Sequence, residues 1–216
     1  MKKFIVLVFL IPFISFAKFY KALVTMNDGS TKKGFIELPD FPDNAKIKFR
    51  LAEKGDSEKL NINDVKSFEI TNDENEKINF ITIYGAQKGK GDKLKIDKNK
   101  SWARVIKEGK INLYRTHTTS TGGSVAASGM SVQGTGSSEG FEYFINRPGD
   151  NYAMNTNYIQ LGGLSFCGSC FNLFKKTIFN IFENDCPKLV DLIEKEDIKK
   201  NGLVRLVELY EQNCGK

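Results

Sequence analysis

The chain's fold is limited most by a run of short segments, between residues 19 and 115, in which apolar and polar side chains alternate. Residues 45–51 are typical, because Ile47 and Phe49 fall on one side of an extended chain and basic side chains on the other. This period of two predicts strands with one buried face. Turn residues separate the segments, as at residues 27–30, and no segment of helical period intervenes. The pattern excludes a parallel βαβ fold and predicts an antiparallel sheet, which forms a barrel or a sandwich.

The last fifty residues have a different period. Two apolar stripes recur at helical spacing: Phe171, Phe174, Ile178 and Phe182, then Leu203, Val207, Tyr210 and Cys214. Such stripes are typical of the buried faces of amphipathic helices. Pro187 suits the first turn of another helix, which we expect over residues 187–196, before a turn at 197–202 and a last helix at about 203–213. The predicted fold class is therefore α+β, with an antiparallel β domain over residues 18–160 and a helical tail over 161–216.

Residues 118–140 interrupt the β domain with a stretch rich in Ser, Thr and Gly. This composition offers little apolar surface to bury, so we expect a long flexible loop at the tip of a hairpin. A phosphate-binding loop needs a glycine-rich turn that opens into a helix, usually with a lysine. Here a strand-like segment follows at residues 141–145 and the stretch has no lysine, which argues against nucleotide binding.

The N-terminal residues have the three parts of a secretory signal peptide. Lys2 and Lys3 are basic, residues 4–16 are almost continuously apolar, and small residues stand at the −3 and −1 positions of a cut after Ala17. We therefore expect residues 1–17 to be removed and the protein to be periplasmic or secreted. No later run of 18 apolar residues occurs, so we expect no transmembrane helix in the mature chain. Nucleic acid is not an expected partner in that compartment.

Four cysteines in an exported chain favour disulfides. Cys186 precedes the expected helix at 187–196, and Cys214 follows the last one. If the turn between them makes these helices antiparallel, the two cysteines come within bonding range, so we favour a Cys186–Cys214 disulfide.

Cys167 and Cys170 form a Cys-Gly-Ser-Cys motif followed by an apolar helix. This stretch of about fifteen residues resembles the active-site helix of thioredoxin-like oxidoreductases, but the later strands and cis-proline of that fold have no counterpart here. We favour a structural local disulfide or an unreactive pair of thiols, and keep a periplasmic thiol–disulfide oxidoreductase as the alternative function. A zinc site would need a second Cys-x-x-Cys, which is missing.

Catalytic constellations are not recognisable. His117 is the only histidine, it stands in a polar run, and no Gly-x-Ser-x-Gly elbow accompanies it. We therefore predict a non-catalytic protein without catalytic residues, metal ligands or cofactor.

The formal net charge of +6 is concentrated in one region. Residues 85–110 hold nine basic and three acidic residues, and the lysines at the centre are Lys88, Lys90, Lys93, Lys95, Lys98 and Lys100. These six are candidates for contact with an anionic surface. The alternative is a solvated edge strand that resists aggregation.

Four short stretches, at residues 109–114, 141–145, 185–189 and 210–214, together resemble uncharacterised exported proteins of Bacteroidota-type bacteria. Those proteins combine an N-terminal β region with a cysteine-bearing helical tail. The resemblance implies a cell-envelope protein of unknown function, with no catalytic residues to carry over. We separately expect a binding or structural role, with another envelope protein or an anionic surface component as the partner.

Overall fold

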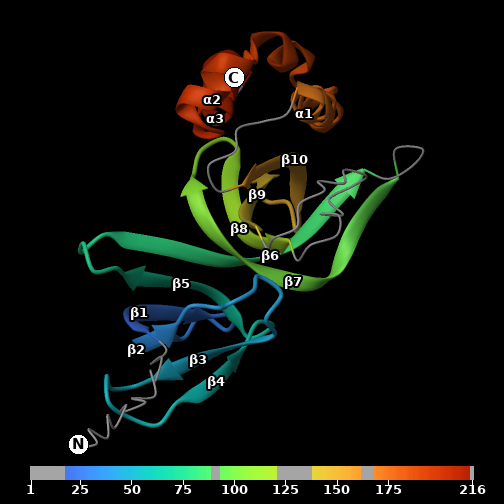
Figure 1. Ribbon diagram of the computed structural model, residues 1–216. Helices are drawn as coiled ribbons and strands as arrows, with labels where there is room; N and C mark the ends of the chain where they lie inside the picture. The colour runs from blue at the N-terminus through green and yellow to red at the C-terminus, as the bar shows by residue number, and fades with distance from the viewer. Residues whose placement is uncertain (1–17, 89–92, 121–137, 162–167, 215–216) are drawn as a thin grey trace, which may run out of the picture.

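A computed structural model describes residues 18–88, 93–120, 138–161 and 168–214 of the chain (Figure 1). The strands are β1 (Phe19–Met26), β2 (Thr31–Glu37), β3 (Lys46–Arg50), β4 (Glu58–Asn61), β5 (Val65–Thr71), β6 (Lys77–Lys88), β7 (Leu94–Lys107), β8 (Asn112–Ser120), β9 (Ser138–Asn146) and β10 (Ala153–Leu161). The helices are α1 (Gly168–Phe182), the 3-10 helix η1 (Pro187–Leu192), α2 (Lys195–Asn201) and α3 (Val204–Asn213). The fold class is α+β, as predicted.

The ten described strands form one sheet in the order β10-β9-β8-β7-β6-β5-β1-β2-β3-β4. Every pair of neighbours in this order is antiparallel, so the antiparallel sheet is confirmed. The sheet curves strongly enough that β10 also meets β6, through two parallel residue pairs, Ala153 with Gly85 and Met154 with Ala86. The sheet as a whole is not a closed barrel. The predicted choice between a barrel and a sandwich is therefore not confirmed.

The described residues form three apolar clusters. One lies among β1–β5 and is completed by Trp102 of β7, and a smaller one lies among β6–β10 and includes Ala103. The third lies between the helices and the sheet, where Phe174 of α1 and Leu113 of β8 are fully buried. The long strands β6 and β7 supply residues to all three clusters. The helices therefore cover the C-terminal half of the sheet, as Figure 1 shows.

The predicted apolar stripes of the tail are its buried faces. Phe174, Ile178 and Phe182 have no exposed surface, and Val207 of α3 is equally buried. None of the described helices has the length and apolar composition that a membrane span requires. Residues 1–17 lie outside the described part of the chain, so the signal peptide stays a prediction.

The prediction of one helix over residues 187–196 is wrong. The 3-10 helix η1 ends at Leu192, the backbone of Glu194 is extended, and α2 then takes up most of the predicted turn. The buried residues Leu189, Ile193 and Ile198 are spaced by four and then five positions, which does not suit one continuous helical face. The extended residue between the helices lets all three side chains reach the same core.

The boundaries of the predicted loop at 118–140 are also wrong. Residues 118–120 and 138–140 extend β8 and β9, which pair as far as Ser120 and Ser138. Residues 121–137, the rest of the expected loop, lie outside the described residues.

Candidate functional site

The predicted lysine cluster lies at the far end of the β6–β7 pair, where Lys88 is opposite Leu94. We call residues 86–88 and 93–100 the basic arm (Figure 1). Lys93, Lys95 and Lys98 are exposed, and none of them forms an ion pair within the described part of the chain. The structure thus places these three cations on one short stretch, with Lys93 just before β7 and the other two within it.

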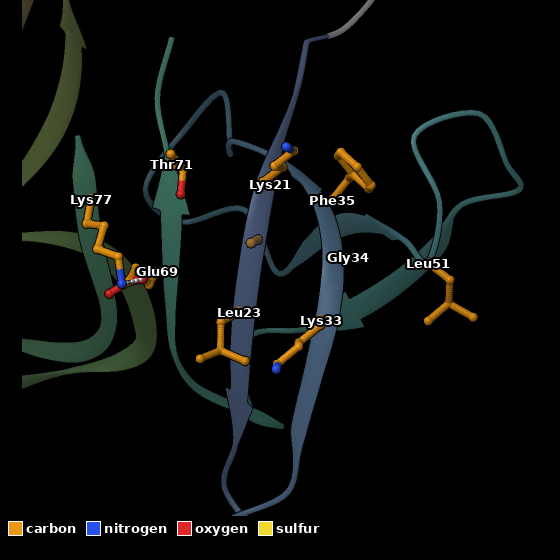
Figure 2. A pocket seen from close by; sticks show the side chains of 10 residues that line it. Lys21, Leu23, Lys33, Gly34, Phe35, Leu51, Glu69, Thr71 and Lys77 are labelled. Atoms are coloured by element: carbon orange, nitrogen blue, oxygen red, sulfur yellow. Dashed lines mark ion pairs between the residues drawn. The ribbon is translucent and has the colours of Figure 1, made fainter. Parts of the chain in front are cut away.

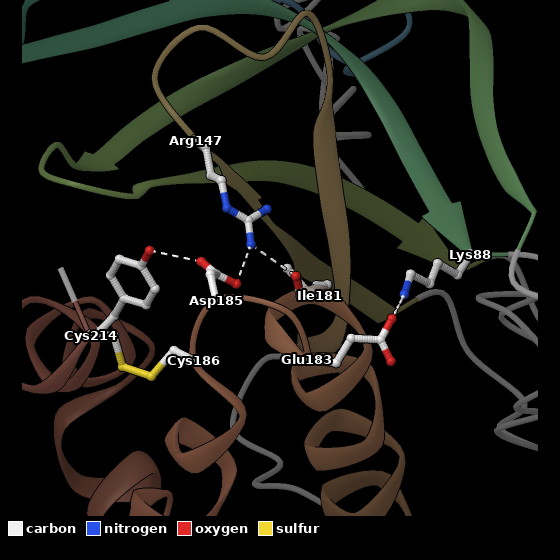
Figure 3. A network of polar contacts seen from close by, with 8 residues as sticks. Lys88, Arg147, Ile181, Glu183, Asp185, Cys186 and Cys214 are labelled. Carbon is white, nitrogen blue, oxygen red and sulfur yellow. Dashed lines mark hydrogen bonds and ion pairs between the residues drawn. A yellow bond between two sulfur atoms is a disulfide. The ribbon is translucent and has the colours of Figure 1, made fainter. Parts of the chain in front are cut away.

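The other predicted lysines differ. The Nζ atom of Lys88 lies 2.6 Å from a carboxylate oxygen of Glu183, so Lys88 holds the basic arm against α1 (Figure 3). The Nζ atom of Lys100 lies 5.7 Å from the centre of the Tyr84 ring, within cation–π range. Lys90 lies outside the described residues. Lys88 and Lys100 therefore have partners within the protein, whereas the three exposed lysines form no ion pair with any described residue.

Apolar side chains accompany the charges of the basic arm. Leu94 is 44% exposed and Ile96 is 45% exposed. They stand two positions apart on β7, so both side chains leave the same face of the strand. Asp97, the acidic residue of this stretch, lies close to Gly85 of β6, where a Cβ atom would collide with its carboxylate. Lys95, which stands between Leu94 and Ile96, leaves the opposite face, and Asp97 is itself exposed. The exposed surface of the basic arm therefore carries cations, two apolar side chains and one carboxylate.

Among the predicted cysteines, Cys186 and Cys214 form a disulfide, as favoured, with Cα atoms 5.6 Å apart. Cys170 lies in the first turn of α1, and Cys167 lies outside the described residues. Their pairing, and the thiol–disulfide chemistry considered for them, stay predictions.

A polar network beside the disulfide joins the helical tail to the sheet (Figure 3). Arg147, in the turn between β9 and β10, donates from Nη2 to the Ile181 carbonyl and to Oδ1 of Asp185, both at 2.9 Å. The Tyr210 hydroxyl donates to Oδ2 of the same Asp185 at 2.9 Å. Burial and this hydrogen bond raise the pKa of Tyr210. Each described polar group has a partner in the protein, so we regard this network as structural.

A shallow, open depression of about 470 Å³ lies over β1, β2 and β5 (Figure 2). Leu23 and Leu51 are exposed beside it, together with Lys21 and other lysines. The ion pair of Glu69 with Lys77, 2.9 Å long, occupies one side of the depression. The lining contains no buried cation that lacks a partner.

A narrower cleft of about 250 Å³ lies where β5–β9 pass under the connection between β2 and β3. We call it the arginine cleft and define it by Phe80, Trp102, Arg104, Arg115, His117 and Phe141. Sequence reasoning missed this group apart from His117, which we expected to be simply solvated. The ring of His117 meets that of Phe141 edge-on, with centroids 5.7 Å apart. The sequence pattern that comes closest to indicating this cleft is a spacing of two. It puts Trp102 and Arg104 on one face of a strand, and Arg115 and His117 on one face of another.

Comparisons with protein-family models, with curated proteins and with solved structures gave no match to this chain.

Proposed function

We propose that this chain is an exported, non-catalytic protein of the bacterial cell envelope that binds anionic lipid head groups through its basic arm. The observation that supports this function is the grouping of Lys93, Lys95 and Lys98 on one exposed stretch with two exposed apolar side chains. A membrane interface offers both negative charge and an apolar layer beneath it.

Charge supplies the larger share of the expected binding energy. Each lysine near an anionic membrane surface contributes about 1 kcal/mol, so the three exposed lysines contribute about 3 kcal/mol together. Leu94 and Ile96 still expose nearly half of their surface. Because complete burial of such a side chain is worth 1.5–3 kcal/mol, we expect each of them to add about 1 kcal/mol on insertion.

The neighbouring contacts hold the basic arm in place. Lys88 is paired with Glu183, the residue that follows α1, and α1 is held in turn by Arg147 through the carbonyl of Ile181. The basic arm therefore keeps its position relative to the tail, and little conformational entropy has to be lost on binding.

Co-sedimentation with lipid vesicles tests this function. We expect the mature protein to sediment with vesicles that contain phosphatidylglycerol, to stay in solution with phosphatidylcholine alone, and to be released as the salt concentration rises. Equal binding to the two kinds of vesicle would contradict the proposal. So would strong binding to an envelope protein combined with no binding to anionic lipid.

A further inference from the structure

The arginine cleft has features that the basic arm does not explain. Phe80, Arg104 and Arg115 stand directly opposite one another on three neighbouring strands, β6, β7 and β8. Side chains at directly opposite positions have Cβ atoms about 5 Å apart, and like charges there destabilise a sheet. The register therefore holds two permanent positive charges side by side.

No carboxylate of the described residues forms an ion pair with either arginine. The arginines that form ion pairs among the described residues are Arg147 and Arg205. Burial, together with the charge of Arg115, lowers the pKa of Arg104, while the charge of Glu76 acts in the opposite direction.

Arg115 is held in a defined position with a donor still unused. Its guanidinium carbon lies 4.0 Å from the centre of the Phe141 ring, a close cation–π contact. Its Nε atom is buried and has no hydrogen-bond partner among the residues that the structure describes. Leaving a buried charged donor unpaired is costly, so an acceptor that reaches this group would be bound favourably.

The apolar side of the cleft is held together by hydrogen bonds. Trp102 donates its backbone N–H to the Pro42 carbonyl at 2.7 Å and its indole N–H to the Asn44 carbonyl at 2.8 Å. These bonds tie the β2–β3 connection to β7, so that Pro39 and Pro42 line the cleft opposite the sheet. The volume of about 250 Å³ corresponds to about eight water molecules, enough for a small organic anion.

We propose that the arginine cleft binds a small amphipathic oxyanion. A carboxylate or phosphate group lies between Arg104 and Arg115, where planar guanidinium groups can donate paired hydrogen bonds. An aromatic or short aliphatic body packs against Trp102 and the neighbouring prolines. This site is separate from the basic arm, so either can fail without the other.

The test uses the fluorescence of Trp102, the single tryptophan of the chain. The intact mature protein is titrated with phenylacetate, phenyl phosphate and inorganic phosphate, and calorimetry measures the same affinities. We expect a saturable change in emission with at least one of the two aromatic anions, and weaker binding of inorganic phosphate. The stronger of the two aromatic anions identifies the head group as carboxylate or phosphate.

Arg104→Gln and Arg115→Gln are each expected to weaken binding by about 10- to 150-fold, the loss typical of a charge-assisted hydrogen bond. Lys107→Gln, which removes an exposed cation from the same strand, is the control and should bind as the unchanged protein does. If a glutamine variant does not fold, Arg104→Lys replaces it in the test. This variant keeps the positive charge but lacks the planar guanidinium group, so it should also bind the anion more weakly. Absence of saturable binding by every probe, or full affinity in all three arginine variants, would overturn the proposal. Inorganic phosphate binding as tightly as phenyl phosphate would overturn the assignment of the apolar body.

Discussion

Replacing Cys186 and Cys214 together with alanine removes the disulfide that joins the start of η1 to the end of α3. The two residues are 28 positions apart. Closing a loop of that length in the unfolded chain costs about 12 cal/mol/K of entropy, so the disulfide contributes about 3.6 kcal/mol at 25 °C. We expect the double variant to lose stability by that amount, because the unfolded chain regains the freedom of the whole tail.

Urea unfolding measures this loss with two probes in different parts of the molecule. Circular dichroism follows the helices of the tail. The fluorescence of Trp102 follows the apolar cluster in which this β7 residue packs with β1–β5. With a denaturant slope of about 2 kcal/mol/M, the midpoint should fall by about 1.8 M. The control is the double change Cys167→Ala and Cys170→Ala, which leaves the 186–214 bond intact and no free thiol to exchange with it. A loss of stability below about 1 kcal/mol would refute the argument from chain entropy. If the urea midpoint shifts when it is measured by fluorescence but not by circular dichroism, the effect does not belong to the tail.

Three further predictions test the packing and the electrostatics. Gly34→Ala should destabilise the protein by about 1–3 kcal/mol in urea unfolding, because the new Cβ would lie 2.6 Å from the Phe49 ring, whereas Gly55→Ala meets only ordinary contacts and should be nearly neutral. Arg147→Met should cost about 1 kcal/mol, since its ion pair with Asp185 is partly exposed, while Lys176→Met on the outside of α1 should change little. Burial raises the pKa of Tyr158 to about 12, above its value of about 10 in an unfolded chain, so its contribution to stability is complete below pH 10 and is lost as the pH rises toward 12. In urea unfolding, the Tyr158→Phe variant should lose less stability between pH 10 and pH 12 than the unchanged protein does. Identical dependence of stability on pH in the two proteins would contradict this prediction.

The elements that the sequence predicts well are those whose periodicity reflects burial. In β1 and β2 alternation is clear, and the turn at residues 27–30 joins them into a hairpin. The tail helices are equally readable, because Phe174 and Val207 belong to continuous apolar stripes that the core buries. In both cases a local pattern decides the local structure.

The strands β4 and β10, which the sequence pattern does not predict, lack such a regular alternation. In β4, Leu60 is the buried residue among four, which is too short a segment to show alternation. In β10 a threonine, Thr156, occupies a fully buried position, and it is accommodated because its hydroxyl donates to the Tyr143 carbonyl at 2.9 Å. Buried polar residues with partners supplied by distant strands cannot be distinguished from loop residues in the sequence alone.

Of the two candidate sites, one can be found in the sequence and the other only in the structure. The basic arm is contiguous in the sequence, so charge counting finds it, although only the structure shows that Lys88 is already paired with Glu183. The arginine cleft depends on the register that sets Arg104 of β7 opposite Arg115 of β8. Register between strands is a tertiary property, which explains why no local motif marked this site.

The most direct test of the proposed function compares two triple variants with the same change in charge. Lys93→Gln, Lys95→Gln and Lys98→Gln neutralise the basic arm, whereas Lys46→Gln, Lys54→Gln and Lys59→Gln neutralise exposed lysines of the N-terminal half. The measured quantity is the partition coefficient on phosphatidylglycerol vesicles. Since three lysines are worth about 3 kcal/mol, the first variant should bind about 150-fold more weakly than the unchanged protein, and the second should lose far less. Equal partition coefficients for the two triple variants would contradict a specific role of the basic arm.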